Sequence, residues 1–240
     1  MKKIKMSLLA VTALLSVAFA NAQTADEVIA KSIAAIGGKE KLKQITSIYM
    51  ESGTEVMGSE GATKTTILNG KGYKNESEFN GQQVVQVVTD NGGWMINPFA
   101  GSDAPTALPD EQFKAGRDQI YVGSPFLDYA AHGAKVELLG QEKIGEVNAY
   151  KIKYTNKDAV ETTYYVDPST YYIARAVKKG NAMGQEVTIT MNFSNYQKTD
   201  FGVSLPYTTD IDMGQFALKM NTKKVEVNKA VDPAIFVMPK

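Results

Sequence analysis

The chain has 240 residues, and its 26 basic and 26 acidic side chains give a formal net charge of zero. This balance argues against nucleic-acid binding, which needs a concentrated basic surface. The absence of cysteine excludes disulfides, thiolate catalysis, cysteine zinc sites and the lipid-bearing cysteine of a bacterial lipoprotein.

Residues 1–22 have the pattern of a secretory signal peptide. Three lysines near the start form a positive region, and Leu8–Ala20 is an apolar segment too short to span a bilayer comfortably. Ala20-Asn21-Ala22 fits the small-x-small cleavage rule. We therefore predict cleavage after Ala22, and export to the periplasm without a lipid anchor. The alternative is that residues 1–22 stay attached as an uncleaved anchor helix. No later stretch of the sequence is long and apolar enough to span a membrane.

An amphipathic helix is predicted next, from Thr24 to Gly37. Thr24 and Glu27 have the spacing of a capping box, and Gly37-Gly38 is a natural stop. Apolar residues recur at helical spacing and give the helix one apolar face, formed by Val28, Ile29, Ile33 and Ile36. Lys39–Gln44 is expected to form a short polar turn.

The hydrophobic period then changes to two, which indicates strands. The predicted strands are Ser47–Val56, Ala62–Asn69, Gly72–Phe79, Gln82–Thr89 and a short one at Trp94-Met95-Ile96. Asn80-Gly81 is a strong hairpin signal, because both positions tolerate positive φ. Asn97–Pro105, which contains Gly, Pro and Asp, is predicted to be a loop.

Thr106–Ala134 is the one internal stretch that reads as helix. Pro109 fits a first helical position, followed by two acidic residues that suit the helix dipole. A second helix is predicted at Ser124–His132, where Ser124 is the N-cap and Gly133 the stop. Because this second helix is apolar on most sides, we expect the pair to cover the concave face of a curled antiparallel sheet.

Strands resume after the helical pair. They are predicted at Lys135–Gln141, Tyr150–Thr155, Thr162–Val166 and Tyr171–Val177, and Val187, Ile189, Met191 and Phe193 alternate with polar residues in another. The apolar phase changes between Met220 and Val225, which predicts a bulge near Asn221–Lys224. About ten strands are expected. The fold class is mainly β: one domain, residues 23–240, built on an incomplete, unclosed β-barrel.

Residues that could support chemistry are few. His132 is the only histidine, and no G-x-S-x-G elbow accompanies it, so we expect no catalytic residue. Asp200, Asp210 and Asp212 lack the spacing of a metal-binding loop, and the glycine-rich turns lack a phosphate-binding pattern. No metal and no cofactor are therefore expected.

Apolar and aromatic side chains on or near the helical block are the candidate site. They are Trp94, Phe113, Tyr121, Phe126, Leu127 and Tyr129, and we predict that they line an apolar cavity. Ordinary packing in the core would require the same side chains, so the sequence leaves both interpretations open.

Short motifs along nearly the whole mature chain resemble a known family. They include Asp90-Asn91-Gly92-Gly93-Trp94, Leu139–Gly145, Tyr165-Val166-Asp167-Pro168 and Gly202–Tyr207. In their order and spacing they are similar to the outer-membrane lipoprotein-sorting proteins of the LolA/LolB/LppX-like superfamily, in its larger envelope form. The shorter carrier of that family has an arginine on an early strand that ties its lid shut, whereas Ala62–Phe79 here contains lysines and no arginine.

The resemblance implies an unclosed half-barrel with helices against its concave side. It also implies a periplasmic protein that binds lipid or lipoprotein acyl chains and carries them without catalysis. Envelope membrane proteins that load or accept the ligand are the expected partners, and a monomer without a stable membrane span is the expected form. Two alternatives remain: a non-carrier adaptor of the same fold whose cavity its own side chains fill, and an exported hydrolase that uses His132.

Overall fold

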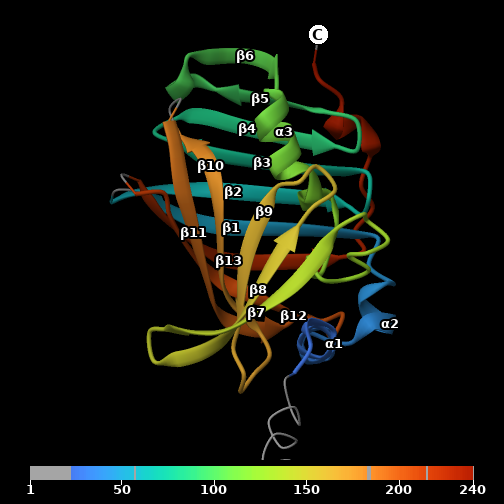
Figure 1. Cartoon of the computed structure of the whole chain (residues 1–240). Coiled ribbons are helices and arrows are strands. Elements are labelled where there is room, and N and C mark those ends of the chain that lie inside the picture. The colour runs from blue at the N-terminus through green and yellow to red at the C-terminus, as the bar shows by residue number, and fades with distance from the viewer. Residues whose placement is uncertain (1–22, 57, 183–184, 215, 240) are drawn as a thin grey trace, which may run out of the picture.

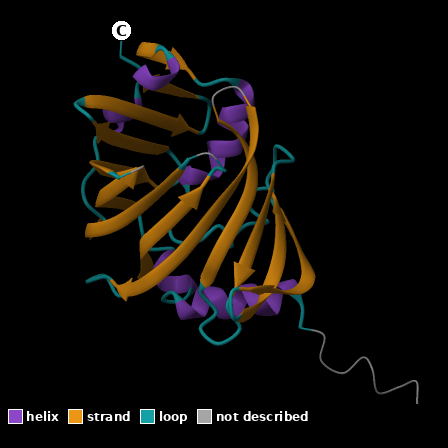
Figure 2. Ribbon diagram, turned by 90° about the vertical axis from the view of Figure 1, so that its left-hand side faces the viewer, coloured by secondary structure: helices purple, strands orange, loops and turns teal. Residues whose placement is uncertain are grey.

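The computed structural model describes residues 23–56, 58–182, 185–214 and 216–239 (Figure 1). The predicted signal peptide, residues 1–22, lies outside this part of the chain. A single 13-stranded antiparallel sheet dominates, in the order β6-β5-β4-β3-β2-β1-β13-β12-β11-β10-β9-β8-β7. Figure 2 shows the sheet curling without closing, and the expected mainly β half-barrel is confirmed.

The elements have the following bounds. The strands are β1 Ser47–Val56, β2 Ser59–Leu68, β3 Gly72–Phe79, β4 Gln82–Thr89, β5 Gly93–Asn97, β6 Ser102–Ala107, β7 Lys135–Ile144, β8 Val147–Thr155, β9 Glu161–Val166, β10 Ile173–Ala182, β11 Gln185–Lys198, β12 Ser204–Asp212 and β13 Ala217–Val227. The α-helices are α1 Ala25–Ala35, α2 Lys39–Leu42 and α3 Asp110–Gly116, and the 3₁₀ helices are η1 Pro98–Ala100, η2 Arg117–Ile120 and η3 Pro233–Phe236.

Local sequence signals explain several of these elements. The capping box of α1 is present: the Glu27 amide donates to Thr24 Oγ1 at 3.3 Å, and the Thr24 amide donates to the Glu27 carboxylate at 3.1 Å. Asn80 and Gly81 both have positive φ, at 52° and 75°, and form the two-residue turn between β3 and β4. Such a turn matches the twist of the paired strands. Both predictions are confirmed.

The predicted bulge in the last strand is also present. On β1, Glu51 faces Lys224 and the next residue, Ser52, faces Thr222, so Lys223 is the extra residue on β13. A bulge of this kind increases the local twist and helps a wide sheet to curl. It also brings Met220 and Val225 to the same face, although they differ by an odd number of residues.

The sheet has an inner and an outer face. The inner face is the one covered by α3, η2 and residues 121–134, and the strand register connects it from β5 around to β8. The outer face of β8–β13 carries a polar row in which the Arg175 Nε–H donates to Asn192 at 2.7 Å and Lys219 pairs with Asp210 at 3.6 Å. On this half of the sheet, the outer face is therefore polar.

Three predictions about elements were wrong. The expected helix Ser124–His132 is a series of turns, because Asp128 has φ +50° and its carboxylate pairs with Lys39 at 2.8 Å and Lys43 at 3.2 Å. The expected loop Asn97–Pro105 contains η1 and most of β6, which is an edge strand that tolerates a proline. The sheet has 13 strands rather than about ten, since hairpin partners such as β6 carry weak sequence signals.

Candidate ligand-binding face

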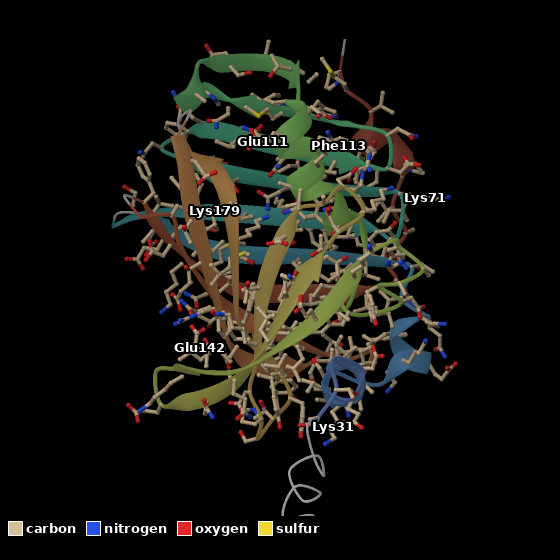
Figure 3. The ribbon with its side chains drawn as sticks, viewed as in Figure 1. Lys31, Lys71, Glu111, Phe113, Glu142 and Lys179 are labelled. Carbon is tan, nitrogen blue, oxygen red and sulfur yellow. The ribbon has the colours of Figure 1, made fainter. Side chains whose placement is uncertain are left out.

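The segment that covers the inner face begins with α3 and η2. Figure 1 places α3 in front of β3 and β4, and Phe113 on this helix is labelled in Figure 3. Phe113 packs with Val88, Met95 and Ile120 in a cluster that joins the helices to β4 and β5. We call α3 and η2 together, residues 110–120, the strap, and apolar contacts hold this side of it.

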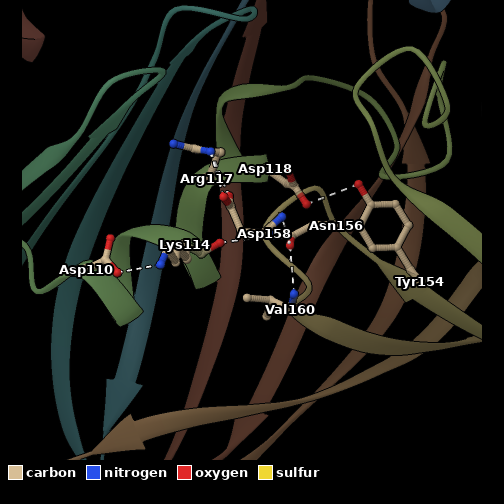
Figure 4. A network of polar contacts seen from close by, with 8 residues as sticks. All are labelled: Asp110, Lys114, Arg117, Asp118, Tyr154, Asn156, Asp158 and Val160. Carbon is tan, nitrogen blue, oxygen red and sulfur yellow. Dashed lines mark hydrogen bonds and ion pairs between the residues drawn. The ribbon is translucent and has the colours of Figure 1, made fainter.

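The other side of the same helices is held by polar contacts to the turn between β8 and β9 (Figure 4). Arg117 Nη1 donates to both Asp158 oxygens at 3.0 and 2.8 Å, and the Asn156 side chain donates to the Lys114 carbonyl at 3.1 Å. The Tyr154 hydroxyl donates to Asp118 at 3.2 Å, and burial raises the pKa of the Asp118 carboxyl. The strap thus bridges two parts of the sheet that are far apart in strand order.

Residues 121–134 continue the cover, and much of this segment is core. Phe126 is 1% exposed and packs with α1 and β8, while Leu127 is buried against α2 and β1. Tyr129 is partly buried, and its hydroxyl donates to Asp26 on α1 at 2.8 Å. Side chains of the protein therefore fill the space between this segment and the sheet.

The predicted site residues do not come together at one cavity. Phe113 and Tyr121 share one cluster, Phe126 and Tyr129 pack in a second, and Leu127 lies in a third. Trp94 points to the opposite, outer face, because it faces Val87 on β4 and packs under Phe236 of the C-terminal segment. Its indole N–H donates to the Phe236 carbonyl at 2.9 Å. We therefore correct its placement: Trp94 does not line the inner face.

Part of the inner face is polar and already hydrogen-bonded. On β1–β3, Thr54 and Thr63 share a hydrogen bond of 2.8 Å, and Thr63 and Ser77 share one of 2.9 Å. The Asn75 amide donates to Thr65 at 3.0 Å. Thr54, Thr63 and Thr65 are buried, and partners satisfy their hydroxyls, so this hydroxyl network needs no ligand.

A second part of the inner face is apolar and incompletely covered. Seven side chains on β11–β13 form it, which we call the inner apolar band: Val187, Ile189, Met191, Phe193, Ile211, Leu218 and Met220. All are only partly buried, and within the described chain none belongs to or packs against the four buried hydrophobic clusters. The band is thus apolar surface that lies outside the buried clusters and is only partly covered.

Sequence reasoning missed this band as a site, although the signal was visible. The alternation from Val187 to Phe193 was interpreted as an ordinary strand with one covered face. The alternation shows that the face is apolar, but only the tertiary structure shows that neither α3 nor the 121–134 segment packs on it.

Two pockets lie along the sheet. One of about 500 Å³ lies at the hairpin end of β12 and β13, and most of its lining, including Asn192, Asp210 and Lys219, belongs to the outer face. The other, of about 370 Å³, lies beside the 121–134 segment and is lined by Tyr121, Leu127, Asp128 and His132 among others. Two predicted site residues, Tyr121 and Leu127, line the smaller pocket.

His132 contributes packing in the smaller pocket. Its ring stacks on Tyr121 with centroids 3.7 Å apart and planes 9° from parallel. Burial lowers the pKa of His132, while the Asp128 and Asp118 carboxylates act in the opposite direction. Among the hydrogen bonds of the described residues, none joins the imidazole to a serine or threonine hydroxyl, which an activated nucleophile would require.

The described residues contain neither a metal-binding cluster nor a helix that could span a membrane. No group of three or more His, Asp or Glu side chains there is arranged to hold a metal ion. Within the same residues, each helix is too short or too polar to cross a bilayer.

Comparison with known proteins identifies similar structures. A LolA superfamily protein from Nitrosomonas europaea superposes with a TM-score of 0.57 at 14% identity, over 90% of this chain and 98% of that chain. A DUF1329 family protein from Desulfovibrio piger gives 0.57 at 14% identity, over 88% and 96%. A domain named for outer membrane lipoprotein sorting, from Vibrio parahaemolyticus, gives 0.56 at 13% identity, over 88% and 94%.

The sequence itself matches no protein-family model and no curated protein. The structural similarity nevertheless extends over nearly the whole described chain, from α1 to the last strands. The fold implied by the sequence motifs is thereby confirmed, and the chain has the unclosed half-barrel fold of LolA-like proteins.

Proposed function

We propose that the protein binds the acyl chains of a lipid or lipoprotein against the inner apolar band, and carries them through the periplasm without catalysing a reaction. The observation that supports the proposal is the band itself: seven apolar side chains on one face of β11–β13, partly exposed and outside every buried cluster of the described chain. Exposed contiguous apolar surface of this kind marks binding sites in soluble proteins.

The energetics favour an acyl chain as the occupant. Covering one methylene group contributes about 0.8 kcal/mol, so a chain of ordinary length has a large driving force to leave water. Ile211 and Leu218 extend the band to the hairpin end of β12 and β13, where a chain could enter along the sheet. The open sheet is expected to receive the acyl chain without unfolding, because no contact in the buried core has to break to expose the band.

An adaptor of the same fold is the second candidate. The buried Phe126 and the satisfied hydroxyl network favour it, since both fill the inner face with the protein's own side chains. An adaptor would use its outer surface and carry no lipid. The hydrolase alternative has weaker support, because His132 stacks on Tyr121.

Extraction of the purified mature protein with organic solvent, followed by mass spectrometry, tests the proposal. We expect co-purified acyl lipid at a substantial fraction of one molecule per protein. A fluorescent fatty acid titrated into the delipidated protein should then bind saturably. Lipid-free protein that also fails to bind the fatty acid would contradict the carrier and leave the adaptor.

A further inference from the structure

Among the described residues of the strands, one lysine on the inner face lies beside the inner apolar band. Lys178 lies on β10 between Ala176 and Gly180, and its direct neighbours across the sheet are Ile189 on β11 and Thr162 on β9. The strand register assigns Lys178 to the inner face. Ala176, two residues earlier on the same strand, faces Tyr164, and the Tyr164 ring lies edge-on to the ring of the buried Phe126 with their centroids 5.2 Å apart. By this register Lys178 belongs to the inner face, whereas the next residue on the same strand, Lys179, which Figure 3 labels, belongs to the outer face.

The side chains next to Lys178 on the sheet are mostly apolar. Ile189 of the inner apolar band leans over Gly180, where an added Cβ would lie 2.5 Å from Ile189 Cδ1. Ala176 is 1% exposed, and only Thr162 offers a polar side chain among the direct neighbours on the sheet. Lys178 itself is only partly exposed, and desolvation lowers the pKa of its ammonium.

No carboxylate compensates this charge at close range. In the described part of the chain, no Asp or Glu oxygen lies within 4 Å of the Lys178 ammonium. Asp118 attracts it from a greater distance, but that carboxylate already accepts the Tyr154 hydroxyl. The neighbouring cations are paired: Arg117 with Asp158 at 2.8 Å and Lys179 with Glu186 at 3.1 Å. A desolvated cation without an ion-pair partner costs stability.

We propose that Lys178 is the head-group site for an acyl ligand that carries an anion, with its chain lying along the inner apolar band. The inference rests on the proposed function, which supplies the chain, and adds the charge of the ligand. A carboxylate or phosphate oxygen at hydrogen-bond distance from the ammonium would form a charge-assisted bond, which is among the strong ones in proteins. Thr162 would add a hydroxyl beside it.

Three single-chain probes test the proposal in calorimetric titrations of the delipidated mature protein. Oleate supplies a carboxylate, 1-oleoyl lysophosphatidic acid supplies a phosphate, and oleyl alcohol has the same chain without charge. We expect Lys178→Met to weaken the binding of at least one anionic probe roughly tenfold, which corresponds to a lost charged hydrogen bond, and to leave oleyl alcohol unchanged. Oleate and lysophosphatidic acid distinguish a fatty acid from a phospholipid as the natural source.

Lys179→Met is the matched control, because it removes an exposed lysine from the adjacent position, and it should change no affinity. Lys178→Arg should retain anionic binding, which a merely structural role would not predict. A thermal melt accompanies each titration, and Lys178→Met should melt at or above the wild-type temperature because it removes an unpaired cation. A lower melting temperature would show that the lysine is structural and would overturn the proposal.

The remaining outcomes separate the two proposals. If the wild-type protein binds all three probes and Lys178→Met weakens none of them, or weakens oleyl alcohol equally, the head-group site is wrong and the acyl-binding function stands. If the wild-type protein binds none of the probes, both are wrong.

Discussion

The two parts of the inner face differ in what covers them. Beneath residues 121–134, the sheet meets Phe126 and Leu127, which are buried among residues of α1, α2 and β8. The seven side chains of the inner apolar band on β11–β13 have the same apolar character but pack against no buried cluster of the described chain. Hydrophobicity alone therefore does not distinguish the proposed binding surface from the covered part. The distinguishing property is apolar surface that the inserted segment leaves uncovered.

The largest expected effect comes from breaking the covered part. Phe126→Asp places a charge at a position that is 1% exposed, and we expect it to lower the free energy of unfolding by roughly 4 kcal/mol or more. The measurement is a denaturant titration of the mature protein. Phe99→Asp is the control at a position that is 53% exposed, and its effect should stay within about 0.5 kcal/mol.

This pair of variants also tests whether Phe126 belongs to a lid that opens to admit the ligand. A Phe126→Asp protein that melts like the wild type but loses fatty-acid binding would show that it does. It would also contradict the distinction between a covered and an uncovered part.

The second effect concerns the polar side of the strap. The Arg117 and Asp158 side chains are each 16% exposed, and Arg117→Met leaves Asp158 without its partner. Breaking a fully buried pair in this way costs about 3–5 kcal/mol, so this partly exposed one should cost about 2 kcal/mol. Unfolding of both single variants and of the double variant with Asp158→Asn gives the measurement. If the losses of unfolding free energy in the two single variants add up to the loss in the double variant, the pair does not tie the strap to the β8–β9 turn.

Local signals in the sequence were reliable guides to the fold. The Thr24–Glu27 capping box, the Asn80-Gly81 turn and the bulge at Lys223 each depend on a few adjacent residues, and each is present. The positions of the candidate site residues depend on distant segments instead. Trp94 faces outward because the C-terminal segment covers that side of β5.

The predicted second helix failed for the same physical reason. Residues 124–132 have helical caps and apolar composition, but Asp128 takes positive φ while it pairs with Lys39 and Lys43 from α2. These ion pairs join segments about ninety positions apart, which no local pattern reveals. Likewise, the alternation on β11 predicts an apolar face and cannot tell whether another segment lies on it.

A third prediction concerns the inner apolar band, the part of the inner face that residues 121–134 do not cover. Met191→Gln and Leu218→Gln should each weaken the binding of a fluorescent fatty acid roughly tenfold, because each removes apolar contact with the chain. Each should change the free energy of unfolding by less than about 1 kcal/mol, since neither side chain packs in a buried cluster.

Thr188→Gln is the matched control for these variants. It lies on the outer face of β11, opposite Lys179, and should leave both binding and unfolding unchanged. Large losses of stability in the Met191 or Leu218 variants would show that the band is core, and unchanged affinity in folded variants would remove it as the binding surface.

The smallest expected effect is a pH dependence at the edge of the covered part. Burial against Tyr121 holds the pKa of His132 below its ordinary 6.5, with Asp128 and Asp118 opposing the shift. The unfolded chain therefore binds this proton more readily than the folded chain, and stability falls as the pH drops through 6.5 toward the folded pKa.

His132→Phe keeps an aromatic ring on Tyr121 and removes that proton. The loss of unfolding free energy between about pH 8 and about pH 5.5 should thus be smaller in the variant than in the wild type. Asp118, whose raised pKa adds stability as the pH falls toward its own more acidic range, is retained in both proteins. Tyr121→Phe preserves both the stack and the imidazole, so it should keep the wild-type slope. Equal slopes in His132→Phe and the wild type would show that the imidazole is as free to take up a proton in the folded protein as in the unfolded chain.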